Sequence, residues 1–433
     1  MNRHAFKPGT ASALVCVLWL MSGCKSLEAP APAAPVTIID YGENAVSTWD
    51  KIAANTINLP PASVGTPQER QPHYALDMAT VHIAIYDAVV AISGSHKPYA
   101  ITPATNATGA SMETAAGVAA YGVLKGLFPA RAAAYQAPYD AFLATLPDSE
   151  AKSRGVALGA EVARAILKMR VSDGRDTPQG PYVPGDTPGK FRGINPAFKF
   201  LANVKPFTLT HSSQFRAGGP PAIGSTAYTK DFNETKAFGA TTSPVRSAAQ
   251  TEVARFHSEP PNRYWTRNLH QFATSQQNLA DNARLMASIW VAHADATIAC
   301  FDSKYHFEFW RPTSAIQLAE SQFNPETSAD ANWQPIVPTP NHPEYPAAHS
   351  CAGAATAEAI RDFYRTEQVS FKFDSTVPGT VVHRFNTTDE LVNEIQAARI
   401  HGGMHFRTAT VDGAALGEKV AKWVAAHHFQ KRN

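Results

Sequence analysis

The sequence predicts an all-α fold. Apolar residues recur at intervals of three and four over residues 75–92, 113–127 and 151–170, which is the spacing of one face of a helix. A fourth segment with this period covers residues 279–300. No stretch alternates apolar and polar residues with comparable strength, and no short internal repeat is present. Packed helical bundles are therefore expected.

Composition places the chain among globular proteins. Its 433 residues are 44% hydrophobic and 17% charged, which is enough apolar side chain for one large domain or for two. The formal charge is only +2, and no long run of Lys or Arg occurs. Nucleic acid is therefore not expected as a partner.

The N-terminus has the pattern of an export signal. Arg3 and Lys7 supply positive charge, and an apolar stretch from 11 to 20 follows, too short to span a bilayer. Small residues then precede Cys24, as in the bacterial lipoprotein signal, in which this cysteine becomes lipidated. Residues 1–23 are thus expected to be a signal peptide of the lipoprotein type.

The segment after the signal is expected to be a tether. Residues 24–44 are rich in Ala and Pro, and the catalytic domain is expected over residues 45–433. Lys25 favours transfer to the outer membrane, so the protein is expected in the periplasm or anchored to that membrane. A lipid anchor is the only membrane association predicted.

Two long segments without helical periodicity separate the predicted helices. Residues 171–228 and 322–346 contain many Pro and Gly residues, which favour irregular surface segments. A helix is expected directly after His349. Another is expected near Thr387, where a capping box begins, and residues 413–428 should resume it after a Gly-Gly interruption.

The first candidate site segment runs from Lys304 to Pro312. Seven residues separate Lys304 from Arg311, so the two cations share a face if the segment is helical. Glu308 is the only acid between them, and a bound anion would explain the arrangement. The alternative is an exposed basic face that is paired with Glu308.

The second segment runs from His342 to Ser350. Prolines on either side of Tyr345 fix an extended loop that delivers His349 to the start of a helix. The free N–H groups of Ala348 and His349 could hold an oxyanion there, while the imidazole transfers a proton. A surface or capping histidine is the alternative.

The third segment runs from Arg399 to Arg407. Arg399 ends a helix, and two glycines let the chain turn close to a ligand before His405. An arginine fork suits an oxyanion, and a neutral imidazole can attack phosphorus or coordinate a metal. His401 is a rival to His405, and a Gly-kinked helix with a structural histidine is the alternative.

Together these segments resemble a known signature. Lys-x6-Arg-Pro, then Pro-x-x-His, then Arg-x5-His is similar to the pattern shared by vanadium-dependent haloperoxidases and type 2 phosphatidic-acid phosphatases. The runs at 84–92, 295–316 and 401–407 resemble the haloperoxidase branch, and the likeness extends from about residue 45 to the C-terminus. It implies helical bundles with an oxyanion site within residues 300–410.

The resemblance also implies roles. His405 would coordinate vanadate, His349 would take a proton from peroxide, and Lys304 would neutralise oxyanion charge and polarise the peroxide. Arg311, Arg399 and the Ala348 N–H would bind the remaining oxygens. The implied cofactor is vanadate, and the implied reaction partners are hydrogen peroxide, a halide and a small organic acceptor. His342 matches the pattern of bromoperoxidase-type members, which favours bromide or iodide over chloride.

Two departures from the family pattern bear on efficiency. Ala347 and Ala348 stand where the family usually has Ser-Gly, which removes one hydroxyl donor to the oxyanion; such a loss costs roughly 1.5–3 kcal/mol. Ala409 stands where the superfamily often has the Asp that orients the last histidine. Asp412 is the nearest acid to that position. Which acid supports His349 is open, with Asp231 and Glu234 as candidates.

Three alternatives follow from the same residues. An exported acid phosphatase would use His405 as nucleophile and His349 as the acid, although Ala409 counts against it. A catalytically impaired anion-binding lipoprotein is the second. A zinc hydrolase is the third, and no His-Glu-x-x-His pattern supports it. Cys300 and Cys351 could pair in an oxidising compartment, and a homo-oligomer is compatible with the sequence.

Overall fold

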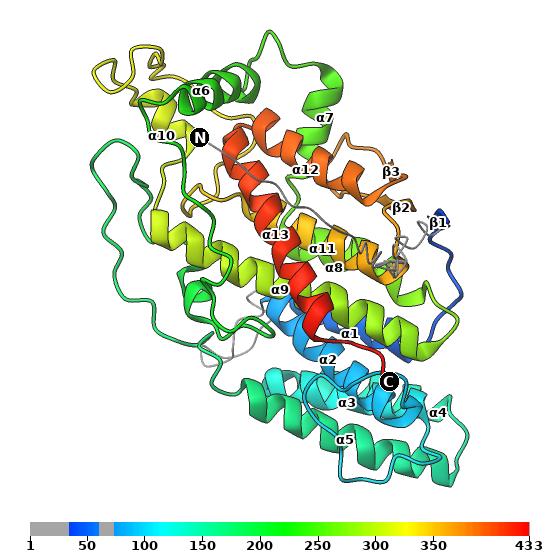
Figure 1. The fold of residues 1–433 in the computed structure, drawn as a ribbon. Coiled ribbons are helices and arrows are strands. Elements are labelled where there is room, and N and C mark those ends of the chain that lie inside the picture. The colour runs from blue at the N-terminus through cyan, green and yellow to red at the C-terminus, as the bar shows by residue number, and fades with distance from the viewer. Residues whose placement is uncertain (1–33, 60–72, 433) are drawn as a thin grey trace, which may run out of the picture. The chain divides into compact units, whose positions relative to one another are not determined.

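Thirteen α-helices and one small sheet make up the described part of the chain, residues 34–59 and 73–432 of the computed structural model (Figure 1). The all-α fold class is confirmed. The described residues lie within one compact unit. The expected signal peptide at 1–23, the lipidation site at Cys24 and the first part of the expected tether, up to residue 33, lie outside the described residues.

The first five helices form one end of the fold. Glycines let α3 and α5 pack closely, because a Cβ added to Gly159 would come within 2.5 Å of the Ala115 carbonyl oxygen. Ser111 and Ser149 cap the two helices at their N-termini. These helices are α1 (Ala45–Ile57), α2 (Tyr74–Ser93), α3 (Met112–Leu127), α4 (Ala132–Ala144) and α5 (Glu150–Arg170).

Helix α2 is apolar on all sides because it lies in the core. It alone among the described helices has the length and hydropathy of a membrane span, and 89% of its apolar window is buried inside the fold. It packs against α3 and against the long helix α9 (Leu279–Phe307). We therefore interpret it as a core helix.

Helix α9 connects the two ends of the fold. It also contacts α11 and α13, and Figure 1 shows it running between the N-terminal helices and the C-terminal ones. It ends where Glu308 adopts a left-handed conformation, with φ of 51°. Lys304 and Arg311 therefore do not lie on one helix, since Arg311 lies beyond this end in extended backbone.

The remaining helices form the second end. A Cβ on Gly417 would lie 2.0 Å from the Cys351 carbonyl oxygen, so only glycine permits the close packing of α11 and α13. The elements are α6 (Thr226–Gly239), α7 (Ala248–Phe256), α8 (Pro261–Leu269), α10 (Pro312–Gln317), α11 (Ala348–Tyr364), α12 (Thr388–His401) and α13 (Arg407–His427).

The predicted break between the last two helices is present but shorter than expected. Thr387 and Glu390 form the predicted capping box of α12, and Gly403 turns the chain with φ of 74°. Helix α13 then begins at Arg407 rather than at residue 413. The amide of Thr408 donates to the Asp231 carboxylate, which stabilises this earlier start.

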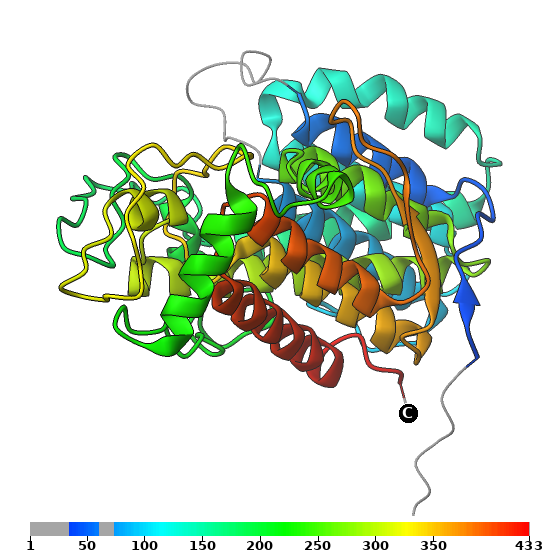
Figure 2. The ribbon, with the colours of Figure 1, turned by 90° about the horizontal axis from the view of Figure 1, so that it is seen from above.

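A three-stranded sheet was not predicted. Its order is β1 (Val36–Thr37), β2 (Val369–Phe373) and β3 (His383–Phe385), with β1 parallel and β3 antiparallel to β2. Strand β1 belongs to the segment that was expected to be a tether. Figure 2 shows the β2–β3 hairpin along one side of the helices, and β3 contacts α12.

Candidate functional site

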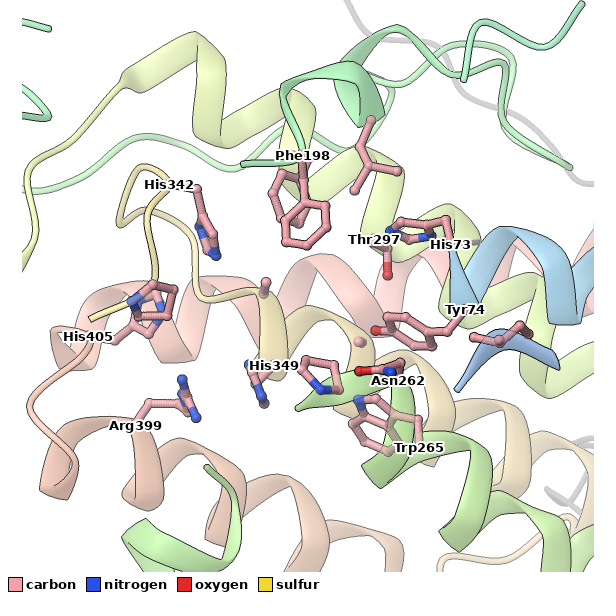
Figure 3. Close-up of a pocket in the computed structure, with 17 residues that line it drawn as sticks. His73, Tyr74, Phe198, Asn262, Trp265, Thr297, His342, His349, Arg399 and His405 are labelled. Carbon is pink, nitrogen blue, oxygen red and sulfur yellow. The ribbon is translucent and has the colours of Figure 1, made fainter. Parts of the chain in front are cut away.

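A cavity of about 270 Å³ brings together residues from most parts of the fold (Figure 3). At one end, His342, His349, Arg399 and His405 face one another. The other end carries Tyr74, Trp265 and further apolar or weakly polar side chains, and Phe198 lies between the two ends beside His342. The cavity thus has a basic end and an aromatic end, and residues 198, 261–265 and 340 were not predicted to line it.

His405 lies in the turn between α12 and α13 and is 1% exposed. Its Nδ1 is 2.9 Å from Oε1 of Glu344, which also accepts the amide of Phe406 at 3.0 Å. Because a carboxylate can only accept a hydrogen bond, Nδ1 of His405 carries the ring proton and Nε2 keeps its lone pair. Glu344 is therefore the acid that orients His405, a role that the sequence left open.

Burial shapes the charge of this pair. It raises the pKa of Glu344 to about 7, although Arg311 and Lys304 oppose the shift. It also lowers the pKa of His405 well below the usual range, with Arg311 and Lys304 adding to the effect. His405 is therefore a neutral imidazole at physiological pH.

Arg311 joins the two sides of the basic end. Its Nη1 lies 3.0 Å from His405 Nε2 and donates to the Met404 carbonyl at 2.9 Å. Its Nε donates to the His342 carbonyl at 2.8 Å, and its Nη2 lies 2.9 Å from His342 Nδ1. The fork of donors is thus fixed toward Nε2 of His405, where a bound anion would meet it.

Lys304 occupies the last turn of α9 and is fully buried. Its ammonium donates to the carbonyls of Pro343 at 2.9 Å, Glu344 at 2.9 Å and Pro346 at 2.5 Å. All three of its protons are used in these contacts. Lys304 therefore holds the loop that carries Glu344, and it contributes charge to the site rather than a free donor. Burial lowers its pKa to about 8.

Helix α11 points its N-terminus at the basic end, as predicted for the segment before His349. Ala348 and His349 begin this helix and line the cavity, and no side chain caps its first turn. The first amides of a helix have no partner within the helix, so they can bind an anion. Burial, followed by Arg399, lowers the pKa of His349 well below the usual range, which keeps its ring neutral.

Arg399 closes the basic end from α12. It is 2% exposed, donates to the His257 carbonyl at 2.9 Å and contacts Met404 Sδ at 2.7 Å. Its Nε is buried and has no hydrogen-bond partner among the described residues. Burial, with Arg311 adding to it, lowers its pKa to about 9.

The basic end has more positive than negative charge. Lys304, Arg311 and Arg399 are buried there with one carboxylate, that of Glu344. Buried charge needs a compensating partner. The donor at Arg399 Nε and the open first turn of α11 fit a tetrahedral oxyanion, and the lone pair of His405 Nε2, which meets Arg311 in this structure, fits vanadate.

Several residues weighed from the sequence lie elsewhere. His401 packs on Phe238 and does not line the cavity. Asp231 supports the start of α13, and Glu234 pairs with Arg407, so neither contacts His349. Asp412 accepts the hydroxyl of Tyr345 at 2.5 Å and thereby braces the loop from the other side.

The two cysteines of the described chain are free thiols. Both are fully buried, in α9 and α11 respectively, directly behind the site loop. The thiol of Cys300 contacts the Pro346 carbonyl at 3.7 Å. A disulfide is not formed between them.

Comparison of the sequence with known proteins gives a family match and a related enzyme, each over part of the chain. A family model for the second helical-bundle domain of VCPO matches residues 284–433. The vanadium chloroperoxidase of Curvularia inaequalis is 27% identical over 31% of this chain, and the match spans 29% of that protein's length.

Solved structures extend the likeness to the whole fold. The first bacterial vanadium-dependent iodoperoxidase has a TM-score of 0.70 at 23% identity, covering 90% of this chain and 97% of that one. The holo-type bacterial vanadium-dependent chloroperoxidase has a TM-score of 0.66 at 17% identity, covering 90% and 98%. The similarity therefore includes the N-terminal helices as well as the matched domain.

Proposed function

We propose that the chain is a member of the vanadium haloperoxidase family and works as a vanadate-dependent haloperoxidase that oxidises bromide or iodide with hydrogen peroxide. One observation carries the proposal. Glu344 holds His405 with Nε2 directed at Arg311, inside a buried end with excess positive charge. This arrangement supports binding of an oxyanion through one imidazole.

His405 Nε2, Arg311, Arg399 and the amide of Ala348 would hold the vanadate. When bound, vanadate supplies a Lewis acid that activates peroxide toward a halide without changing its own oxidation state. Arg311 and Arg399 offset the negative charge of the oxyanion oxygens. Glu344 keeps the proton on Nδ1 of His405, so Nε2 carries the lone pair that would bind vanadate in place of its present contact with Arg311 Nη1.

His349 is the proposed acid–base residue. Its ring is neutral and lines the cavity at the start of α11, so it can accept a proton from hydrogen peroxide at a ring nitrogen. Arg399 lies beside it and disfavours the charged ring. The proton is therefore held briefly and is available for return to a leaving oxygen.

We assign Lys304 a positioning role. The resemblance suggests direct contact with peroxide, but its three protons are donated to the loop carbonyls. By fixing residues 343–346, Lys304 places Glu344 against His405. Its charge also adds to the field that favours an anion.

The proposed preference for the larger halides rests on the wall beside His342. The His342 ring lies 5.2 Å from the Phe301 ring and 6.4 Å from the Phe198 ring. Burial, with Arg311 and Lys304, lowers the pKa of His342 well below its usual range, so this wall is neutral. Larger anions lose less hydration energy on entering such a place, which favours iodide and bromide.

The phosphatase alternative is retained because of Glu344. The absence of an acid at position 409 counts against a histidine nucleophile, yet Glu344 supplies the orienting carboxylate from another loop. Nε2 of His405 is thus equally able to attack phosphorus in a phosphate ester. His349 would then protonate the leaving oxygen.

Parallel assays on one preparation test the proposal. Purified protein, with and without orthovanadate, is assayed for peroxide-dependent iodination, bromination and chlorination of a dye, and for phosphate-ester hydrolysis. We expect vanadate-dependent halogenation, with kcat/KM highest for iodide or bromide. Hydrolysis without vanadate and no halogenation would favour the phosphatase, and silence in all assays would favour an impaired anion binder.

Location is a separate proposal. We propose that the protein is exported and held at a membrane through a lipid on Cys24, on the sequence pattern alone. Replacing Cys24 by Ala should release the protein from the membrane fraction. Retention of the variant would contradict the anchor.

A further inference from the structure

Two histidines and a glutamate from three separate elements meet at one point outside the cavity. His257 follows the end of α7, His383 begins β3, and Glu394 lies in α12. Oε1 of Glu394 is 2.8 Å from His257 Nε2 and 2.7 Å from His383 Nδ1. The three potential ligand atoms lie within 4.8 Å of one another.

The second ring nitrogen of each imidazole also has a hydrogen-bond partner. Oε2 of Glu252 is 2.9 Å from His383 Nε2, and the hydroxyl of Tyr264 is 3.2 Å from His257 Nδ1. The ring of Phe256 stacks on His383 at a centroid distance of 3.8 Å. Both rings are thus fixed so that one nitrogen of each points at Glu394, as in metal sites whose histidines are oriented by outer hydrogen bonds.

We infer that His257, His383 and Glu394 form a binding site for a divalent transition metal ion of the zinc class. Two imidazole nitrogens and one carboxylate oxygen are a donor set that zinc accepts, with a fourth position left for water. On binding, His257 moves its single proton from Nε2 to Nδ1, beside the Tyr264 hydroxyl, while His383 keeps its proton on Nε2 toward Glu252 and releases any proton on Nδ1 to solvent. Nothing in the proposed haloperoxidase reaction requires this ion.

The side chains of this site are exposed enough for a metal ion to reach them from solvent. Glu394 and Glu252 are each 24% exposed, and His383 is 10% exposed, whereas His257 is fully buried. An ion can therefore enter from the side of the β2–β3 hairpin, which Figure 2 shows at the edge of the fold beside α12. Once bound, it would join α7, β3 and α12.

The site lies directly behind the oxyanion cavity. The carbonyl of His257 accepts Nη1 of Arg399, and Arg399 lies in the same helix as Glu394. A metal ion would therefore fix both the acceptor and the helix that position Arg399. Its role is structural, since the ion does not line the cavity.

A second cluster offers a matched control. Asp50 bridges His82 and His270, but through different oxygens, with contacts of 2.9 Å at Oδ1 and 2.6 Å at Oδ2. The two nitrogens thus do not converge on one point. A His270→Gln variant should leave metal binding unchanged.

The test is a titration of untagged, chelator-treated protein with Zn²⁺ by calorimetry and with Co²⁺ by visible absorbance. We expect one equivalent in the wild type, in His270→Gln and in His405→Gln, with tetrahedral Co²⁺ bands and a raised Tm. Glu394→Gln keeps a hydrogen-bond acceptor for both histidines and should lose the bands. Glu252→Gln should weaken binding by about 10- to 100-fold.

Two results would overturn the site. One is the absence of stoichiometric binding in the wild type, and the other is unchanged affinity in Glu394→Gln. If only His405→Gln lost metal binding, the ion would bind in the oxyanion cavity and not at Glu394. Circular dichroism of each variant shows that it is folded, and His383→Gln provides a second ligand variant.

Discussion

The carboxylate of Glu344 and the imidazole of His405 lie 2.9 Å apart, from Oε1 to Nδ1, although 61 positions separate them in the chain. This contact fixes which nitrogen of His405 faces the cavity. Two contacts fix the loop that carries Glu344 beside His405. Lys304 donates to the Glu344 carbonyl, and the hydroxyl of the next residue, Tyr345, donates to Asp412. The proposed chemistry depends on this pair more than on any other contact.

Replacing Glu344 by Gln should therefore weaken vanadate binding by about 10- to 100-fold, because the amide no longer imposes the proton on Nδ1. Equilibrium dialysis with vanadate measures the change. Glu234→Gln is the matched control, since Glu234 pairs with Arg407 outside the cavity. Equal vanadate affinity in the wild type and Glu344→Gln would show that His405 needs no orienting acid.

Glu344 also marks what the sequence could not provide. It stands between two prolines, and no spacing relates it to His405, so only the folded loop reveals the contact. The long helices α2, α3 and α5 and the start of α9 were predicted to within one residue, because each shows the apolar period of a buried helix, whereas α9 continues past the predicted end at residue 300 to Phe307.

Shorter elements escaped prediction for physical reasons. Strands of two, five and three residues are too short to show alternation. The shared face of Lys304 and Arg311 was wrong because Glu308 turns left-handed and ends the helix. The three site segments were found by their residue types, while the hydrogen bonds that fix their roles come only from the fold.

Activity should depend on pH in a narrow window. Glu344 is the stronger hydrogen-bond acceptor for His405 and Phe406 as a carboxylate, so activity should rise as pH passes its pKa of about 7. Lys304 holds the loop only as an ammonium, so activity should fall above its pKa of about 8. A pH profile of kcat/KM measures both limbs. An acid limb that persists in Glu344→Gln would assign it to another group.

Replacing Lys304 by Met should destabilise the fold. The change leaves three buried carbonyls without a donor, and we expect a loss of roughly 3 kcal/mol in the free energy of unfolding, measured in urea. Lys422→Met, on the exposed face of α13, is the control and should change stability little. Unchanged stability together with lost vanadate affinity would mean that Lys304 contacts the anion directly.

Replacing Ala347 by Ser should strengthen vanadate binding. Position 347 is the N-cap of α11, which has no side-chain cap; a serine oxygen there can accept a first-turn amide while its O–H proton is left to donate to a bound anion. We expect about a tenfold lower Kd, corresponding to roughly 1.4 kcal/mol. Ala352→Ser, a change further along α11 at a residue that lines the cavity, is the control. The same gain in both variants would argue against a specific place for the hydroxyl.

In the proposed site, vanadate binds at Nε2 of His405 while His349 accepts and returns protons. The most direct measurement is the stoichiometry and Kd of vanadate binding in the wild type, His405→Ala and His349→Ala. We predict one equivalent in the wild type and in His349→Ala, with no halogenating turnover in the latter, and loss of binding in His405→Ala. Vanadate binding by His405→Ala with wild-type affinity would contradict the account.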